Sequence, residues 1–121
     1  MKGLGTDIIE IERIKEAIQK RERFKKRFFT DNEVEYCEQY KKLWANFAGR
    51  FAAKEAVVKA LGTGFSGFKW QDVEIIATAS GKPEVKLYNG AEKVAHEKGI
   101  MEIMISISHC HDYAVAQAIA L

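Results

Sequence analysis

The sequence predicts an α+β domain in which a long central helix packs on a small antiparallel sheet. Residues 44–61 carry apolar side chains at the spacing of one helix face, which predicts a single long helix. Residues 102–108 and 113–120 have the composition of two strands joined by a short polar turn, which predicts antiparallel pairing. A chain of 121 residues can bury about two thirds of its unfolded surface, so we expect one domain spanning residues 1–121.

The N-terminal half is predicted to be mainly helical after one extended segment. Near Asp7 the pattern changes from extended to helical, because Ile8, Ile11 and Ile14 begin a stripe at helical spacing. Thr30-Asp-Asn-Glu33 has the form of a capping box, which marks the start of another helix. The expected elements are an extended segment over residues 2–7 and helices over 8–19, 22–28, 30–41 and 44–61.

The C-terminal half is predicted to be mainly extended. Ser80-Gly-Lys-Pro83 is typical of a turn between two short strands. A short helix follows and ends at Lys98-Gly99, and His109-Cys-His-Asp112 joins the last two strands. The expected elements are strands over residues 73–77 and 84–88, a helix over 89–97, and strands over 102–108 and 113–120.

Composition indicates a globular protein of a reducing compartment. Hydrophobic residues make up 47% and charged residues 30% of the chain, and no apolar run approaches the ~20 residues of a membrane span. The N-terminal residues lack a signal-peptide pattern. Cys37 and Cys110 lie far apart without metal-type spacing, which favours two reduced thiols. We therefore expect a cytoplasmic protein that does not bind membranes.

Positive charge is concentrated near the N-terminus. Residues 13–27 include eight basic and two acidic side chains, although the net charge of the whole chain is only +2. Such a segment favours a polyanionic partner, and a solvated basic helix is the simpler alternative. Nucleic acid is disfavoured because the sequence has no nucleic-acid-binding motif and no strongly basic domain charge.

Glu55 is the most unusual residue of the long predicted helix. It falls on the apolar face, where an unpaired carboxylate would be costly unless a metal ion or another cation lies beside it. Lys59 lies one turn later, and the helix ends at Gly62-Thr63-Gly64, a left-handed cap that a ligand can approach closely. The alternative is an ordinary surface pair of Glu55 and Lys59 followed by a glycine cap.

Asp7 is predicted to lie at a junction between a strand and a helix, a common place for a site residue. The alternative is a structural role, because Asp7 and Glu10 also have the spacing of a helix capping box. Taken by itself, the residue does not distinguish these two roles.

A set of motifs runs through the whole chain in order. The most specific is Arg50-Phe-Ala-Ala-Lys-Glu55-Ala-Val-Val-Lys59-Ala with the following Leu61-Gly62-Thr63-Gly64. The set also includes Gly3-Leu-Gly-Thr-Asp7-Ile-Ile-Glu-Ile-Glu-Arg13-Ile, Arg23-Phe24, Arg27, Phe29-Thr30, Trp70-Gln-Asp72-Val-Glu-Ile, Gly81-Lys-Pro83, Ile105-Ser106-Ile-Ser108-His109 and Tyr113-Ala-Val-Ala116. In residues, spacing and length it resembles the holo-acyl-carrier-protein synthase family, the small bacterial type of 4′-phosphopantetheinyl transferase.

The resemblance implies an enzyme that transfers 4′-phosphopantetheine from coenzyme A to a serine of apo-acyl carrier protein in support of fatty acid biosynthesis. By analogy, Asp7 and Glu55 hold Mg²⁺, and Lys59 neutralises the pyrophosphate and assists the leaving adenosine 3′,5′-bisphosphate. The serine proton goes to Glu55 or to a metal-activated water. The resemblance also implies a homotrimer.

Further site residues follow from the same resemblance. Positions that handle coenzyme A are Arg50, Gly62, Gly64 and Pro83, with Lys59. The positions that match the arginines with which the family docks onto the acidic carrier protein are Arg13, Arg23 and Arg27.

Alternation of side chains along the predicted strand over residues 102–108 adds two serine hydroxyls to the candidate site residues. Ile103, Ile105 and Ile107 point to the core, so Ser106 and Ser108 share the opposite face with Met104. These serines can donate hydrogen bonds to a phosphate or a pantetheine chain, and a solvent-facing pair is the alternative. Many family members carry His where this chain has Met104, so catalysis here cannot depend on that His.

His109-Cys110-His111 resembles the start of a metal or thiol site. Two imidazoles in a turn do not make a zinc site, and nothing else indicates a catalytic thiolate. His109 instead matches a family position that helps to shape the coenzyme site.

Two other functional classes remain at the level of sequence. A coenzyme A or nucleotide-binding module would keep Lys59 and the glycine loop without needing both carboxylates. A basic nucleic-acid binder would use residues 13–27 and ignore Asp7 and Glu55.

Overall fold

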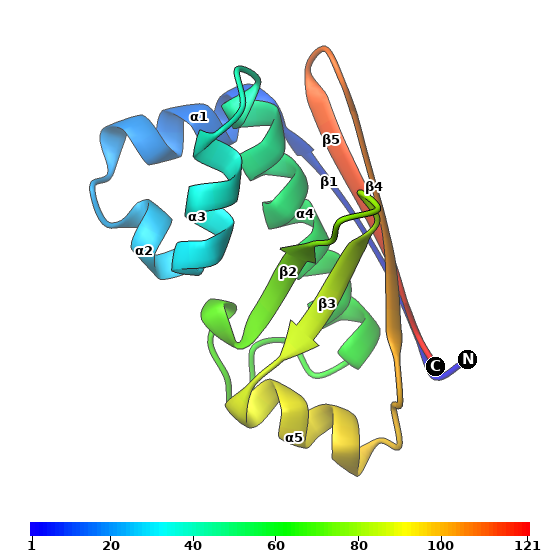
Figure 1. Cartoon of the computed structure of the whole chain (residues 1–121). Coiled ribbons are helices and arrows are strands. Elements are labelled where there is room, and N and C mark those ends of the chain that lie inside the picture. Colours follow the sequence, from blue (N-terminus) through cyan, green and yellow to red (C-terminus); the bar gives the residue numbers. More distant parts are fainter.

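A long central helix, α4, is surrounded by all other parts of the chain (Figure 1). The computed structural model describes every residue from Met1 to Leu121. A three-stranded sheet covers one side of α4, helices α1 to α3 gather at one end, and α5 lies at the other (Figure 1). The elements are β1 (Gly3–Glu10), α1 (Ile11–Lys20), α2 (Phe24–Phe28), α3 (Asp31–Glu38), α4 (Leu43–Leu61), the 3₁₀ turn η1 (Trp70–Asp72), β2 (Val73–Ala77), β3 (Pro83–Leu87), α5 (Asn89–Glu97), β4 (Ile103–Cys110) and β5 (Tyr113–Ala120).

Both sheets are antiparallel. The larger has the order β1-β5-β4, with Gly3 opposite Ala120 and Cys110 opposite Tyr113 at its ends. The smaller is the hairpin β2-β3. The predicted α+β class, with a long helix packed on a small antiparallel sheet, is confirmed.

Small residues allow the larger sheet to approach α4 closely. On β5 the inward positions are all alanine, and α4 presents a row of alanines to them. On β1 the inward positions Gly3 and Gly5 touch the helix backbone, since an added Cβ would lie 1.9 Å from the Ala60 oxygen and 1.8 Å from the Ala56 oxygen. Only glycine fits there, and the close approach brings the next inward residue of β1, Asp7, against α4.

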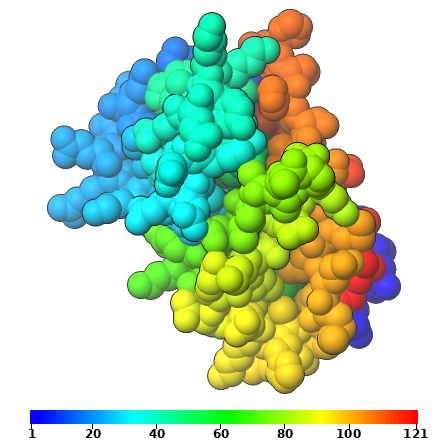
Figure 2. Space-filling model, viewed as in Figure 1, coloured from blue at the N-terminus to red at the C-terminus, as the bar shows by residue number.

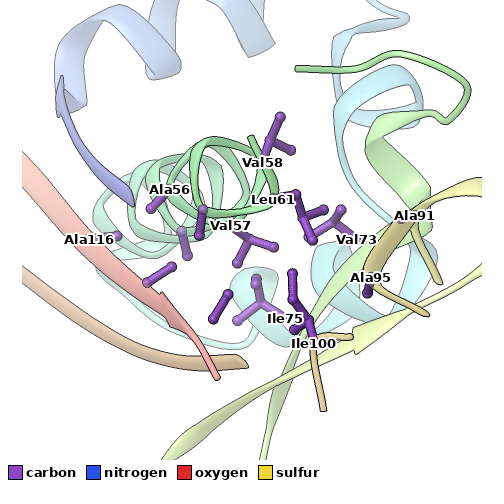
Figure 3. Close-up of a cluster of buried hydrophobic side chains, with 14 of the residues drawn as sticks. Ala56, Val57, Val58, Leu61, Val73, Ile75, Ala91, Ala95, Ile100 and Ala116 are labelled. Carbon is purple, nitrogen blue, oxygen red and sulfur yellow. The ribbon is translucent and has the colours of Figure 1, made fainter. Parts of the chain in front are cut away.

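The core consists of two neighbouring clusters of apolar side chains. The larger lies between α4, the two sheets and α5, where Val57, Leu61, Val73 and Ile75 meet (Figure 3). The smaller, which includes Ile14, Phe29 and Phe47, joins α1 to α3 with the first half of α4. Because α4 contributes to both, most of its residues are buried on every side.

The first strand is longer than predicted. It continues to Glu10, which pairs with Tyr113, and α1 begins only at Ile11. The pairing with β5 outweighs the helical spacing of Ile8 and Ile11, so Ile8 belongs to the exposed face of the sheet. Asp7 therefore lies within a strand, and the predicted junction at this residue is wrong.

The other boundaries shift by a few residues. The capping box at Thr30 and Glu33 is confirmed, with the Thr30 hydroxyl accepting from the Glu33 N–H and the Glu33 carboxylate accepting from the Thr30 N–H. The helices predicted over residues 22–28 and 30–41 are shorter, and the strand predicted over 102–108 continues to Cys110. Ile103, Ile105 and Ile107 pack against the core as predicted.

Candidate active site

Asp7 and Glu55 lie close together although 47 residues separate them in the sequence. Asp7 comes from the inner face of β1, at the free edge of the larger sheet, and Glu55 comes from the middle of α4. Glu55 is half-buried on the helix. The alternative role of Asp7 as a helix cap is excluded, because the N-cap of α1 is Glu10 and it has no side-chain cap bond.

Lys59 connects the two elements. Its ammonium donates to the Thr6 carbonyl oxygen at 2.9 Å and to Asp7 Oδ1 at 3.3 Å. The Lys59 side chain is 52% exposed, so the ion pair with Asp7 is screened by water. The contact holds the ammonium beside both carboxylates without neutralising either of them fully.

The environment raises the pKa of Glu55 above its ordinary value. Burial is the largest cause, the nearby Asp7 carboxylate is the second, and Lys59 opposes both. A cation that contacts both Glu55 and Asp7 would stabilise the charged form of Glu55.

The donor set suits a hard divalent cation. Asp7 and Glu55 offer carboxylate oxygens, and the structure has no group of three or more His, Cys, Asp or Glu residues arranged for a metal. Mg²⁺ commonly takes one or two protein carboxylates and fills its other positions with water and substrate phosphates. Two carboxylates at an open cavity fit that pattern.

A cavity of about 820 Å³ opens in front of these carboxylates. Its wall includes Asp7 and Glu55 together with apolar side chains such as Ile14 and Phe51. Arg13 and Lys20 from α1 add positive charge. The cavity thus joins the acidic pair to the basic N-terminal segment.

Comparison with known proteins identifies the family. Residues 3–118 match the family described as the 4′-phosphopantetheinyl transferase superfamily. The holo-[acyl-carrier-protein] synthase of Alkaliphilus metalliredigens is 55% identical over 120 residues, which are 99% of this chain and 98% of that protein. The corresponding synthase of Caldanaerobacter subterraneus is 53% identical over 118 residues, 98% of this chain and 93% of that protein.

The chain belongs to the 4′-phosphopantetheinyl transferase superfamily. A solved holo-acyl-carrier-protein synthase from Bacillus anthracis, in complex with coenzyme A (3′,5′-ADP), superimposes with a TM-score of 0.80 at 35% identity, covering 98% of this chain and 95% of that one. The predicted resemblance to holo-acyl-carrier-protein synthases and the predicted enzyme class, a phosphopantetheinyl transferase, are confirmed.

In this transferase fold the three predicted docking arginines lie in the first two helices or directly before the second. Arg13 is on α1 and lines the cavity with the carboxylates. Arg23 precedes α2 and Arg27 lies within it, with the Arg27 guanidinium 5.3 Å from the Phe28 ring centre. Figure 2 shows these helices, in blue and light blue, at the end of the molecule away from α5.

Arg50 lies away from the carboxylates in this chain. Its guanidinium stacks on the Tyr36 ring of α3 at 4.2 Å from the ring centre, and the residue is 8% exposed. The buried Nε atom has no hydrogen-bond partner. An unpaired buried donor is costly, so the site favours an additional acceptor.

The remaining predicted coenzyme residues are spread over the fold. Gly62 and Gly64 follow α4 with positive φ angles of 82° and 63°, near Lys59. Ser106 and Ser108 lie on the outer face of β4 with Met104, opposite to the inward face that carries Asp7 on β1. His109 is exposed near the end of β4, and Pro83 begins β3. Within one chain these residues do not meet the carboxylate pair.

Sequence reasoning missed the buried ion pair behind the site. Lys54 Nζ lies 2.6 Å from Glu33 Oε1, and both side chains are fully buried. Glu33 Oε2 also accepts from the Ile75 N–H at 2.8 Å, so the pair joins α3, α4 and β2. Burial raises the pKa of Glu33 and lowers that of Lys54, and the attraction between them opposes both shifts. Glu33 was visible only as a capping residue, and nothing in the pattern around Lys54 distinguished it from a surface lysine.

Lys98 was also missed. Its ammonium, at the end of α5, donates to the Leu61 carbonyl oxygen at 2.5 Å and closes the C-terminal end of α4 beside Gly62. A cation at a helix C-terminus is favourable, and here it holds the start of the glycine loop. The two positions are 37 apart in the sequence, so no local pattern indicates this contact.

Proposed function

We propose that the chain transfers 4′-phosphopantetheine from coenzyme A to a serine of apo-acyl carrier protein and releases adenosine 3′,5′-bisphosphate. The observation that carries this proposal is that Asp7 and Glu55 meet at a cavity bordered by the basic helix α1, with the Lys59 ammonium bound to Asp7. The names of the relatives support it, since they are holo-acyl-carrier-protein synthases, and one solved relative holds coenzyme A.

Asp7 and Glu55 are the residues that would hold Mg²⁺. When bound, the metal supplies positive charge for the pyrophosphate oxygens and for the charge that develops on the transferring group. The proton of the carrier serine would go to Glu55, which lines the cavity, or to a water that the metal activates.

Lys59 is proposed to bind the pyrophosphate and to stabilise the leaving phosphate. In the structure its ammonium is held by the Thr6 carbonyl and by one Asp7 oxygen, which leaves donor capacity for a phosphate. The positive charge of Lys59 would stabilise the negative charge on the phosphate oxygens, which is largest in the transition state.

Carrier docking is proposed for Arg13, Arg23 and Arg27. Arg13 lines the cavity together with apolar side chains, which suits a partner with an acidic helix and some exposed apolar surface. We expect the KM for the carrier to rise with salt, because exposed charges are screened over about 8 Å at physiological ionic strength.

The coenzyme site and the assembly are proposed together. Ser106 and Ser108 lie on the outer face of the larger sheet, away from the carboxylates of their own chain, and His109 is exposed near the end of β4. A homotrimer would allow such residues of one protomer, and Arg50 and Pro83 with them, to face the carboxylates and the Gly62–Gly64 loop of the next. The exposed apolar side chains of this sheet support an assembly.

Three broader assignments belong to the same proposal. Residues 1–121 form one transferase domain, and the reaction supports fatty acid biosynthesis. A cytoplasmic location is supported by the two free thiols, Cys37 and Cys110. None of the helices combines the length and the apolar character that crossing a membrane requires.

A transfer assay tests the proposed function. The protein is incubated with apo-acyl carrier protein, coenzyme A and Mg²⁺, and the carrier is weighed by mass spectrometry. We expect the carrier to gain one phosphopantetheine group, and chelation of Mg²⁺ with EDTA to stop the gain. Binding of coenzyme A without any change in carrier mass would instead indicate a binding module.

A further inference from the structure

The short helix α2 contains one proposed docking arginine, Arg27, and directly follows another, Arg23, yet it has little stability of its own. It has five residues and no side-chain cap at its N-terminus. Helices this short do not persist in water unless contacts with the rest of the protein hold them. Its last carbonyl groups have no partners within the helix and need donors from elsewhere.

Gln71 supplies those donors. Its side-chain Nε2 donates to the Arg27 carbonyl oxygen at 2.7 Å and also to the Lys26 carbonyl oxygen. Gln71 lies in η1, more than forty residues away in the sequence, so the contact fixes α2 to a distant part of the fold. The amide replaces the water that would otherwise solvate the end of the helix.

The neighbouring Trp70 fixes α2 through a second contact. Its ring meets the Phe28 ring edge-on at 4.9 Å and stacks on the Phe51 ring of α4 at 4.8 Å. Residues 70 and 71 therefore hold the helix by an aromatic contact on its side and by hydrogen bonds at its end.

The turn that carries these residues is itself anchored. Asp72 accepts from the Lys69 N–H at 3.0 Å and from the Asn89 side chain at 2.9 Å, and β2 follows immediately. A helix fixed to this turn holds its position relative to α4, which carries Glu55.

We propose that Gln71 is a positioning residue for carrier-protein docking: it holds α2 so that Arg23 and Arg27 present a preformed cationic surface. The inference rests on the proposed function, because it concerns the carrier substrate of that reaction. Gln71 acts through α2 and does not touch the reacting atoms. A preformed surface binds its partner more tightly, since less ordering remains to be done on binding.

The test is the variant Gln71→Leu, which keeps the size of the side chain and removes both donors without adding charge. The matched control is Gln39→Leu, at an exposed glutamine whose side chain makes no hydrogen bond within the protein. We expect the KM for the carrier to rise about three- to tenfold in Gln71→Leu, as for the loss of one or two hydrogen bonds. The kcat and the KM for coenzyme A should stay within about twofold of the wild-type values, and the control should change none of the three.

A double-mutant cycle with Arg27→Ala separates positioning from general damage. If Gln71 acts through the docking arginines, its effect on the carrier KM shrinks once Arg27 is absent. Amide hydrogen exchange in α2 should also become faster in Gln71→Leu. Should that variant fail to fold, Gln71→Asn, whose amide is one methylene too short to reach both carbonyls, carries the same expectations.

The outcomes distinguish this inference from the proposed function. An unchanged carrier KM, an equal loss for both substrates, or full additivity with Arg27→Ala overturns the role of Gln71. Absence of transfer by the wild-type protein would overturn the proposed function itself, and the inference with it.

Discussion

Asp7 and Glu55 share one neighbouring ammonium, that of Lys59, and Glu55 is also half-buried. Lys59 contacts Asp7 directly, whereas Glu55 has no such contact and its pKa is raised. Burial, and after it the Asp7 carboxylate, therefore disfavours the charged form of Glu55. A divalent cation between them would remove the repulsion and release Lys59 for a phosphate.

The first prediction concerns the two carboxylates as metal ligands. Asp7→Asn and Glu55→Gln keep the side-chain shape, and each should lower Mg²⁺-dependent transfer roughly 100-fold or more, because one anionic ligand is lost. Steady-state rates over a Mg²⁺ titration check this. Asp31→Asn, at an exposed residue of α3, is the control and should keep wild-type rates. Near-wild-type turnover of either folded site variant at limiting Mg²⁺ would contradict the assignment.

The second prediction concerns stability and pH. Because the pKa of Glu55 in the folded protein is above its ordinary value of 4.5, the folded state binds more protons than the unfolded state between the two pKa values. The contribution of Glu55 to the free energy of unfolding therefore falls as pH rises through this window. Without metal, the free energy of unfolding of Glu55→Gln should exceed that of the wild type at pH 7. The difference should vanish at about pH 4.

Urea unfolding at several pH values measures this difference. Added Mg²⁺ should stabilise the wild type and leave Glu55→Gln nearly unchanged, since ligands stabilise only the state that binds them. If the free energy of unfolding of the wild type rose relative to that of Glu55→Gln as pH increases, the prediction would be wrong.

The third prediction separates the two roles of Lys59. Lys59→Met keeps the length of the chain and removes the charge, so kcat should fall, by about tenfold or more, with little change in the KM for the carrier. Kinetics with each substrate varied in turn measure the effect. An unchanged kcat with a raised KM for coenzyme A would make Lys59 a binding residue only.

At the scale of elements, α4 organises the molecule, and its sequence predicted this only in part. Its length, its glycine cap and the unusual position of Glu55 were readable from apolar spacing. The number of buried faces of α4 could not be predicted, because apolar spacing indicates only one buried face. In the structure α4 packs on the larger sheet, on α3 and on β2. Lys54 consequently looked like a surface residue, although its partner Glu33 makes it part of the core.

The fourth prediction follows from this buried pair. Lys54→Met leaves the Glu33 carboxylate without its cation and should lower the free energy of unfolding by about 3–5 kcal/mol. The matched control is Lys25→Met, which breaks the exposed pair of Lys25 and Glu38 and should cost less than about 1 kcal/mol. Denaturant unfolding of the three proteins checks the contrast, and equal losses would show that burial of the pair does not govern its contribution.

The first strand shows where local pattern misleads. Ile8 and Ile11 begin a helical stripe, and Asp7 with Glu10 fits a capping box, yet the chain stays extended through Glu10 because it pairs with β5. The pairing involves residues more than a hundred positions apart, and no window around Asp7 contains it. The prediction that Asp7 is a site residue does not depend on that boundary, since the motif and the carboxylate itself supported it.

At the scale of the whole molecule, the outer face of the larger sheet is too apolar for a surface exposed only to water. Leu4, Ile119 and Met104 stand in one row across its three strands and are 59%, 36% and 44% exposed. Ile8 and Tyr113 extend the same face. Adjacent exposed apolar side chains on a rigid sheet favour contact with another protein surface, and a second copy of the chain is the occupant that the proposed trimer supplies.

The fifth prediction tests this assembly and its connection to catalysis. Ile119→Glu places a charge at the middle of the row, where burial against another protomer would be costly, so the protein should change from three chains to one in light scattering. Transfer should fall with it, because Ser106, Ser108 and His109 of one protomer would no longer reach the carboxylates of the next. Tyr40→Glu, at an exposed aromatic residue of the α3–α4 connection, is the control and should remain trimeric. A trimeric Ile119→Glu protein, or a fully active single chain, would show that the outer face of the sheet does not complete the site.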